Sequence, residues 1–372
     1  MSNSYEEKYK KEWENFSKKK INPNIMLLGV TGCGKSSLIN LVFGKDIAPV
    51  NDISRGTKGF NKYSGKKYGI SVNLIDSRGY EMENGSNESF EEYKKSIQVE
   101  MQKSEQSGAE NKIHIIWFCI SVAAERIQDY DIEVLKLLLS NQELKKRVAV
   151  ILTKCDEDDE DGGTASTFKD IIRSEVDSQI DIFETSTDKN LTLELMELIK
   201  WSSEQLGDDD LKEAFISSQM IDLDMKRLEV NSKIKYYAGA AAAIGATPVP
   251  VSDAALLTPL QITMSANIIY LYGMENLTSI SSALLGNIVI SNLGKSIVGG
   301  ILKFIPGVGT LVGGVINAGV ASLITSGLGY AISEICYDSC KKIAKGEYVD
   351  LSKLFDFDSI SKLTNEYIKK NK

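Results

Sequence analysis

Eight residues near the start of the chain restrict its fold more than any other stretch. Residues 29–36 read G-V-T-G-C-G-K-S, in which two glycines enclose four residues and are followed by Lys and Ser. Glycines let successive backbone N–H groups turn inward around an anion, the Lys adds a positive charge, and the Ser hydroxyl can hold Mg²⁺. A short apolar run precedes the pattern and helical spacing follows it. A chance match is the alternative, but this context favours a phosphate-binding loop.

From residue 24 to residue 203, short apolar runs alternate with segments of helical spacing. The runs typical of strands lie at 25–29, 70–75, 113–120, 148–152 and 181–185. The segments typical of helices lie at 35–43, 88–105, 126–140, 165–177 and 191–205. This alternation predicts an α/β fold with a doubly wound, mostly parallel sheet that binds ligands at the carboxyl ends of its strands.

Two short motifs fall where such a domain would hold a magnesium-bound nucleotide. The sequence D-S-R-G at 76–79 follows the apolar run 70–75. In that place Asp76 can orient the Mg²⁺ shell, and the N–H of Gly79 can meet the γ-phosphate. Thr57 lies in a loop between the first helix and the second strand, from which it can close onto Mg²⁺ and the same phosphate.

A further motif concerns the base. The sequence T-K-C-D at 153–156 follows the apolar run 148–152. In this spacing the carboxylate of Asp156 can accept two N–H bonds from a guanine edge, and the stem of Lys154 can lie over the ring. Adenine presents the opposite order of donors and acceptors, so the motif favours GTP over ATP.

The four motifs in this order resemble the translation-factor-like GTPases, and among them the Era-like group, over about residues 24–203. The resemblance implies a phosphate site made of Gly29, Thr31, Gly32, Cys33, Gly34, Lys35, Ser36 and Ser37. It implies Mg²⁺ ligation by Ser36, Thr57 and Asp76, and a γ-phosphate contact from Gly79. Guanine would be read by Lys154 and Asp156, with Ser186 matching the family's loosest guanine-loop motif.

Two positions depart from the pattern of that family. Thr153 stands where an Asn is usual, as in dynamin-like and immunity-related GTPases. Tyr80 stands where Ras-like enzymes have a water-orienting Gln, which predicts slow intrinsic turnover that relies on other elements or on a second GTPase domain. Arg55 and Arg78 are candidates for neutralising transition-state charge, in cis or across a dimer, beside Lys35, Thr57 and Gly79 as catalytic residues. The alternative for both arginines is a solvated loop.

Three other features invite a functional interpretation, and for each a structural one is preferred. The single histidine, His114, lies in an apolar run and predicts a strand residue rather than a catalyst. The acidic run 156–161 lacks the spacing of a Ca²⁺ loop and predicts a solvated loop. Aromatic residues at helical spacing in 2–20 predict a helix that packs on a neighbouring domain or binds a partner.

Charge falls sharply from about residue 236 onward. Uncharged apolar stretches span 254–274, 276–294 and 306–333, and about 18 such residues can cross a bilayer. Their many Ser, Thr, Asn and Gly residues leave three interpretations open: a helical bundle that docks on a membrane, inserted hairpins, or no membrane role. Three stretches in this region carry a further resemblance: A-T-P-V-P-V-S-D-A-A-L-L-T-P-L-Q at 246–261, I-Y-L-Y-G at 269–273 and I-P-G-V-G at 305–309. With them, residues 233–335 resemble an uncharacterised domain found behind Era-like GTPase domains in bacteria, often described as membrane-associated. The order of domains is similar to that of immunity-related GTPases, which oligomerise on membranes.

The chain of 372 residues is thus expected to contain five parts: an N-terminal helix (1–23), a GTPase domain (24–203), a helical connector (204–232), an apolar helical domain (233–345) and charged C-terminal helices (346–372). A net charge of −8 disfavours nucleic acid as a partner. Five cysteines without framework spacing and an N-terminus without a secretory signal predict a cytoplasmic protein, either free or held at the inner face of the cell membrane.

Three functions remain open at this point. The first is a GTP-hydrolysing switch or mechanoenzyme, with GTP/GDP and Mg²⁺ as ligands, that forms a nucleotide-dependent homodimer or oligomer and acts on membrane lipid through its helical domain. The second is a ribosome- or RNA-associated assembly factor, which some Era-like proteins are. The third is a scaffold that holds GTP with little turnover.

Overall fold

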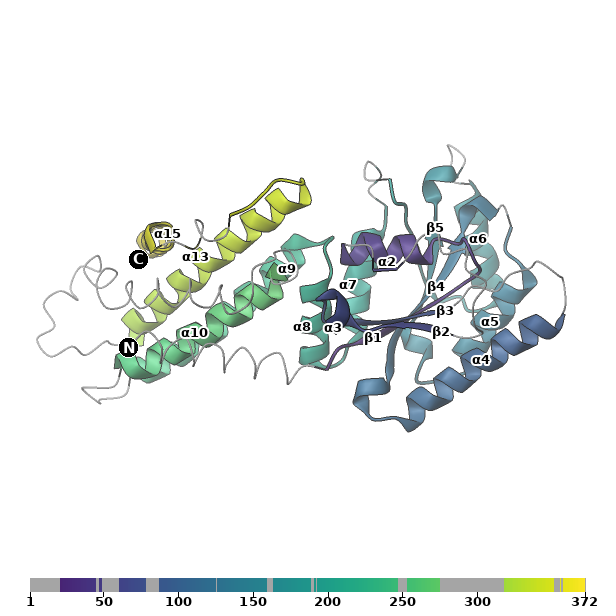
Figure 1. Ribbon diagram of the computed structural model, residues 1–372, viewed down its shortest axis with the longest axis horizontal. Coiled ribbons are helices and arrows are strands. Elements are labelled where there is room, and N and C mark those ends of the chain that lie inside the picture. The colour runs from purple at the N-terminus through teal and green to yellow at the C-terminus, as the bar shows by residue number, and fades with distance from the viewer. Residues whose placement is uncertain are drawn as a thin grey trace, which may run out of the picture. The chain divides into compact units, whose positions relative to one another are not determined.

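The computed structural model describes residues 21–44, 47–48, 60–77, 87–124, 126–158, 163–188, 191, 193–246, 253–274, 318–350, 355 and 357–371 (Figure 1). The chain divides into two compact units: an α/β unit, Ile21–Asp222, and a helical unit whose described part begins at Leu223. The sequence expectations for the N-terminal helix, Arg55, Thr57, Arg78, Gly79 and Tyr80 lie outside the described residues.

The α/β unit is built on one six-stranded sheet with the order β2-β3-β1-β4-β5-β6. The strands are β1 (Asn24–Leu28), β2 (Phe60–Tyr63), β3 (Asn73–Ser77), β4 (Ile113–Ser121), β5 (Val148–Thr153) and β6 (Asp181–Glu184). All neighbouring strands pair in parallel except β2, which runs antiparallel to β3. Because β1 lies between β3 and β4, the loops after these three strands meet at one edge of the sheet.

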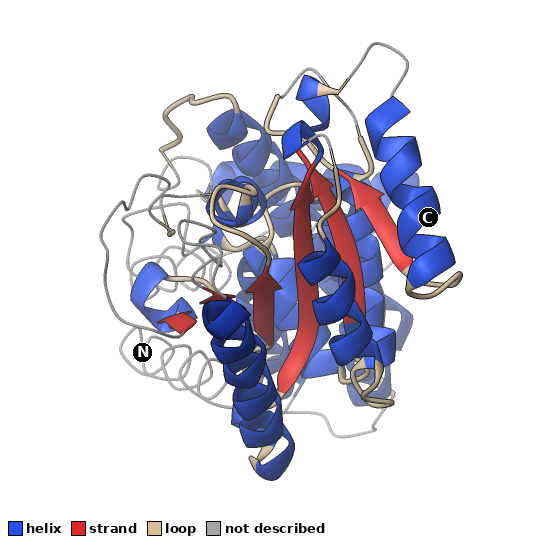
Figure 2. Cartoon of the chain, turned by 90° about the vertical axis from the view of Figure 1, so that its right-hand side faces the viewer, coloured by secondary structure: helices blue, strands red, loops and turns tan. Residues whose placement is uncertain are grey.

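Helices cover both faces of this sheet (Figure 2). They are α2 (Lys35–Phe43), α3 (Gly65–Tyr68), α4 (Asn87–Gln106), α5 (Asp129–Leu139), α6 (Gly163–Glu175), α7 (Leu195–Gln205) and α8 (Asp209–Ser218), with 3-10 turns η1 (Ala109–Asn111), η2 (Val122–Ala124), η3 (Lys145–Arg147) and η4 (Cys155–Glu157). On one face, Trp117 of β4 stacks on Phe43 of α2 and donates to Ser202 of α7, while Phe215 of α8 meets Phe43 edge-on. Helices α4, α5 and α6 cover the other face.

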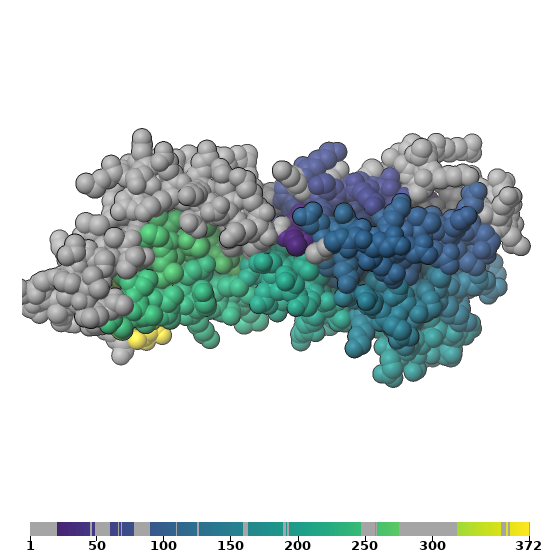
Figure 3. Space-filling view, turned by 90° about the horizontal axis from the view of Figure 1, so that it is seen from below, coloured from purple at the N-terminus to yellow at the C-terminus, as the bar shows by residue number. Residues whose placement is uncertain are grey.

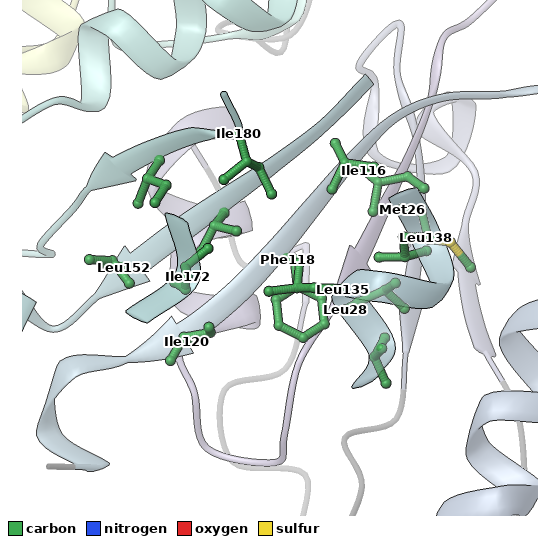
Figure 4. Packing of buried hydrophobic residues seen from close by; sticks show 14 of the residues in the cluster. Met26, Leu28, Ile116, Phe118, Ile120, Leu135, Leu138, Leu152, Ile172 and Ile180 are labelled. Carbon is green, nitrogen blue, oxygen red and sulfur yellow. The ribbon is translucent and has the colours of Figure 1, made fainter. Parts of the chain in front are cut away.

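Alternation along the strands builds the core under α4, α5 and α6. Successive strand side chains point to opposite faces, so Met26 and Leu28 share a face with Phe118 and Ile120 of the neighbouring strand (Figure 4). Leu135 of α5 packs in the same cluster, and each of these side chains is almost fully buried. Burial on both faces explains why the strands appear in the sequence as continuous apolar runs.

The fold class predicted from the sequence is confirmed: a mostly parallel sheet with helices, followed by a helical region. Two local differences have physical reasons. Strand β2 was missed because this antiparallel edge strand buries none of its four side chains completely and therefore lacks an apolar run. Strand β3 begins at Asn73 rather than at residue 70, since the short helix α3 and its αL cap at Gly69 occupy the approach to it.

The helical unit consists, in its described part, of α9 (Leu223–Gly245), α10 (Asp253–Leu271), α13 (Ala318–Ala344) and α15 (Phe357–Lys370). Its core joins Ile234 of α9, Met264 of α10 and Leu328 of α13, all nearly fully buried. In the space-filling view of Figure 3, the atoms of α9 and α10, coloured green, lie next to each other on the surface. Helix α9 runs unbroken through residues 232 and 233, so a single element carries the chain from the charged segment into the apolar one.

One helix among the described residues, α13, has the length and apolar composition that a membrane crossing requires. More than half of its most apolar stretch is buried inside the unit, where Ile332 and Cys336 face α9 and α10. A core helix of a water-soluble bundle has the same properties, so this feature alone does not assign the helix to a bilayer.

Candidate functional site

The phosphate loop follows β1 and ends in the first turn of α2. Gly29 has φ +132°, and a Cβ at this position would lie 2.3 Å from the carbonyl oxygen of Cys119 on β4. Gly34 caps α2 in the αL conformation, with φ 93°. Only glycine satisfies both requirements without strain. The loop therefore leads into the N-terminus of α2, where free backbone N–H groups and the helix dipole favour an anion.

Lys35 is folded back onto the loop. Its Nζ donates to the carbonyl oxygens of Gly29 at 2.8 Å and Val30 at 2.9 Å, and the residue is buried. Burial disfavours the charged ammonium, but the neighbouring Cys33 and Asp76 outweigh it, so the pKa of Lys35 lies above its ordinary value. Lys35 is thus a permanent cation whose present partners are neutral carbonyls, which a phosphate can replace.

Asp76 lies at the end of β3, where it pairs in register with Leu27 of β1. The residue is only 6% exposed, and its Oδ1 has no hydrogen-bond partner. Burial raises the pKa of this carboxyl to about 6, although Lys35 acts in the opposite direction. A buried carboxylate oxygen without a partner fits a missing cation, and the half-buried hydroxyl of Ser36 at the start of α2 is a second oxygen ligand of the type Mg²⁺ prefers.

A pocket opens beyond the phosphate loop, between α2 and the loops after β5 and β6. It has a volume of about 120 Å³ and is lined by Gly34, Ser37, Leu38, Leu41, Thr153, Lys154, Asp156, Glu157, Thr185, Ser186 and Thr187. The pocket is lined by the loop residues predicted to read a base and also by Gly34 of the predicted phosphate loop. Lys154, with φ 58°, takes the αL conformation there.

Two backbone hydrogen bonds hold the two base loops together. The N–H of Thr185 donates to the carbonyl of Leu152 at 2.7 Å, and the N–H of Cys155 donates to the carbonyl of Thr185 at 3.2 Å. Across this junction the hydroxyl of Ser186 donates to Oδ1 of Asp156. Ser186 therefore holds the carboxylate that the sequence predicts will accept the guanine N–H groups.

Thr153 joins the base pocket to the phosphate loop. Its Oγ1 lies 2.5 Å from the carbonyl oxygen of Cys33 and 3.3 Å from that of Ile120, and a single hydroxyl proton serves the shorter contact. The sequence marked Thr153 only as a departure from the usual Asn. The structural role was not visible there, because no pattern indicates which carbonyl the hydroxyl would reach.

The other residues predicted to form the phosphate loop lie at its tip or beneath it. Thr31 and Gly32 are exposed at its tip, and Cys33 is buried beneath it with its Sγ 3.7 Å from Nζ of Lys35. Burial raises the pKa of the Cys33 thiol, although Lys35 opposes the shift. Among the described residues no cluster of three or more His, Cys, Asp or Glu side chains is arranged to hold a metal.

Two titratable residues complete the picture of the α/β unit. His114 stands near the start of β4, away from the phosphate loop, and its Nδ1 accepts the N–H of Asn24 at 3.0 Å. Burial, followed by Arg147 and Lys112, lowers the pKa of His114 to about 4, so a neutral strand residue is what the structure contains. Asp131, which sequence reasoning missed, caps the start of α5 and is buried.

Comparisons with known proteins fit this geometry. Residues 24–154 match a family model described as 50S ribosome-binding GTPase. GTP-binding protein A of Dictyostelium discoideum is 46% identical over 57 residues, which are 15% of this chain and 12% of that relative. The chain therefore spans well under two thirds of the curated relative that it matches.

The solved structures that match share less of the sequence. Toc33 from Arabidopsis thaliana, in complex with GDP and Mg²⁺, is 16% identical with a TM-score of 0.37, covering 56% of this chain and 93% of that chain. The chloroplast translocon components atToc33 and psToc159, for whose GTPase activity dimerization is important, give 15% and 0.38, covering 54% and 91%. An oligomerised bacterial dynamin pair that senses and tethers membranes gives 10% and 0.32, covering 97% and 85%. Likenesses of this size say nothing about the activity of this chain.

Proposed function

We propose, from the premise that residues 24–154 carry a GTPase domain of the family described as 50S ribosome-binding GTPase, that this chain binds GTP with Mg²⁺ and hydrolyses it as a conformational switch. One observation carries the proposal. Lys35, Asp76 and Asp156 come from three separate segments, and the order of the strands brings them to the same edge of the sheet. A cation, an unpartnered carboxylate and a base-reading carboxylate are then arranged as a guanine nucleotide needs them.

The residues of the chain divide the work of binding. The ammonium of Lys35 leaves the carbonyls of Gly29 and Val30 to donate to the β- and γ-phosphates, together with the N–H groups at the start of α2. Asp156 accepts the N–H groups of guanine while Ser186 holds its carboxylate in place. Mg²⁺ would be held by Ser36, by Asp76 and by Thr57 from the segment between α2 and β2. When bound, it would neutralise charge at the terminal phosphates.

Hydrolysis is proposed to be slow in the isolated chain. Tyr80 cannot orient a water molecule as a glutamine amide does, so the missing group must come from elsewhere. Arg55 and Arg78 are candidates, acting in cis or in a nucleotide-dependent homodimer. Contacts of Thr57 and Gly79 with the γ-phosphate would be released on hydrolysis, which makes the two loops the moving parts of the switch.

The helical unit is proposed to be the part that the switch controls, either by docking on a membrane at the inner face of the cell or by self-assembly. Support comes from its composition. The segment 276–317 contains only two charged residues, Lys295 and Lys303, and α13 is long and apolar enough for a membrane. Residues 204–222 and the unbroken helix α9 connect this unit to the nucleotide site along the chain.

The first experiment compares Lys35→Ala with wild type in equilibrium binding of fluorescent GDP and GTP. Loss of the cation should weaken binding by at least roughly 100-fold, since a charge-assisted contact to phosphate is removed from a buried site. Lys145→Ala is the matched control, because Lys145 pairs with Asp177 before β5 begins, away from the phosphate loop. Micromolar GTP affinity retained by Lys35→Ala would overturn the assignment.

The second experiment measures GTP hydrolysis with and without anionic lipid vesicles, across a range of protein concentrations. A specific rate that rises with concentration or lipid supports assembly as the source of the missing group. A slow rate that is flat in both leaves a switch that awaits an external activator and contradicts the membrane role. Multiple turnovers in any condition exclude a scaffold without useful hydrolysis.

A ribosome-associated role is the second candidate, and the description of the matching family favours it. The net charge of −8 argues against it, since ribosomal RNA attracts basic surfaces. Co-sedimentation with purified large ribosomal subunits in GDP and in a non-hydrolysable GTP analogue separates the two roles. Nucleotide-dependent co-sedimentation would replace the membrane proposal.

A further inference from the structure

Helix α4 reaches the nucleotide site through one side chain. Phe90, Tyr93, Ile97 and Met101 lie at helical spacing on the face of α4 that packs on the sheet. An apolar side chain at residue 93 would fill this face equally well. Tyr93 instead carries a hydroxyl into the core region beside the phosphate loop, where it donates to Oγ of Ser77 at 3.4 Å.

The phenol of Tyr93 lies between the end of β3 and the phosphate loop. On the side of the loop, the backbone of Gly29 and the charge of Lys35 both act on the phenol, against the upward shift in its pKa that burial causes. On the side of the sheet, Ser77 directly follows Asp76, the proposed magnesium ligand. Burial raises the pKa of Tyr93, so the hydroxyl keeps its proton and can act as a donor.

The surroundings of this hydroxyl differ in their freedom to move. Gly29 is fixed, because it packs so closely against Cys119 that not even a Cβ would fit. Lys35 is not fixed, since its two carbonyl partners must be exchanged for phosphate oxygens when nucleotide binds. The buried oxygen of Asp76 likewise gains a partner only with the cation. Both changes occur near the hydroxyl of Tyr93, which belongs to helix α4.

We propose that Tyr93 is a positioning residue that couples the occupancy of the γ-phosphate and magnesium site to helix α4, through its hydrogen bond to Ser77 at the end of β3. This inference rests on the proposed function. Tyr93 acts by holding the end of β3 and the start of the loop in one arrangement, and by passing a change in that arrangement to α4.

The test compares Tyr93→Phe with wild type in the full chain, with Tyr130→Phe as matched control. Tyr130 lies on α5 with its ring against Phe90 of α4, so the control removes a phenol hydroxyl from the same helix pair. Affinities for GDP and for a non-hydrolysable GTP analogue are measured at saturating Mg²⁺. Amide hydrogen exchange of residues 87–106 is measured in both nucleotide states.

Tyr93→Phe should leave GDP affinity within about 2-fold and weaken the GTP analogue by about 3- to 10-fold, the range for one lost hydrogen bond. The difference in exchange of α4 between the two states should shrink, while Tyr130→Phe should keep it. Ser77→Ala should reproduce the effect, and combining it with Tyr93→Phe should add little, because both remove the same contact.

Several results would overturn the inference. One is equal weakening of both nucleotides by Tyr93→Phe, which is what a purely structural packing role would produce. Another is a variant whose affinities for both nucleotides equal those of wild type. A third is a wild-type chain in which the amide hydrogens of α4 exchange equally in both nucleotide states. A wild-type chain that binds neither nucleotide contradicts the proposed function instead, so the two failures are distinguishable.

Discussion

The hydroxyl of Thr153 donates a 2.5 Å hydrogen bond to the carbonyl oxygen of Cys33, and this contact joins the end of β5 to the phosphate loop. Thr153 is 5% exposed, so neither partner has water as a substitute. Since Lys154 and Asp156 lie within three residues of Thr153, this single side chain ties the pocket that they line to the phosphate loop.

Replacing Thr153 by Val keeps the shape of the side chain and leaves the Cys33 carbonyl unsatisfied. We expect GDP affinity to fall by about 10-fold, because an unpaired buried carbonyl costs on the order of 1–3 kcal/mol. Titration calorimetry measures the change. Thr153→Ser, which keeps the hydroxyl, should stay within about 3-fold of wild type. Equal losses in both variants would show that the methyl group matters rather than the hydrogen bond.

We expect the carboxylate of Asp156 to set the choice of base. Asp156→Asn replaces an acceptor by a group that also donates, so guanine should lose at least roughly 100-fold in affinity. Xanthine, which has a carbonyl in place of the exocyclic amine of guanine, should bind to this variant more tightly than to wild type. Competition binding with GDP and xanthosine diphosphate reports both. Ser186→Ala, which removes only the hydroxyl that holds the carboxylate, should weaken GDP without changing the order of preference. If xanthosine diphosphate gains nothing, Asp156 does not contact the base edge.

Asp131 predicts a pH dependence of stability. Burial raises its pKa from 3.8 to about 7, while the N–H of Gln128 opposes the shift. The folded chain therefore binds more protons than the unfolded chain between these values, and the stability that depends on Asp131 falls as pH rises through this window. Asp131→Asn still accepts from Gln128 but carries no charge.

Relative to wild type, Asp131→Asn should raise the free energy of unfolding by on the order of 2 kcal/mol at pH 8 and by clearly less at pH 5. Urea unfolding at the two pH values provides the comparison, using the transition that added GDP shifts, because ligand stabilises the unit that binds it. A gain that is the same at both pH values would mean that the carboxyl of Asp131 does not titrate in this range.

Close packing in the helical unit depends on Gly329. A Cβ on this residue of α13 would lie 2.8 Å from Cγ1 of Ile234 and 3.1 Å from Sδ of Met264. Gly329→Ala should therefore destabilise the unit by about 1–3 kcal/mol. Gly239→Ala on α9 is the matched control, because nothing lies within 4 Å of its Cβ and a helix gains about 0.5–1 kcal/mol from the change. The free energy of unfolding is measured on the transition that added GDP does not shift. Stabilisation by both variants would refute this account of the interface.

Local patterns were enough to predict much of the α/β unit. The bounds of helix 35–43 were predicted as the structure has them, because Gly34 and Gly44 mark its two ends in the sequence itself. Strands β4 and β5 were found as apolar runs, since burial on both faces makes most of their residues apolar. Strand β2 escaped because it lies at the edge, and the partners of Thr153 and Tyr93 escaped because each is distant in sequence.

The sequence by itself determined the phosphate loop, the motifs at the strand ends and the alternation that places them on a parallel sheet. Each of these depends on contiguous residues whose backbone conformation or burial is decided locally. Only the tertiary structure decided that Thr153 would reach Cys33, that Asp76 would keep an unpartnered oxygen, and that Tyr93 would meet Ser77. Those relationships follow from the order of the strands and the packing of helices across them, and residues far apart in the chain meet only when that packing is complete.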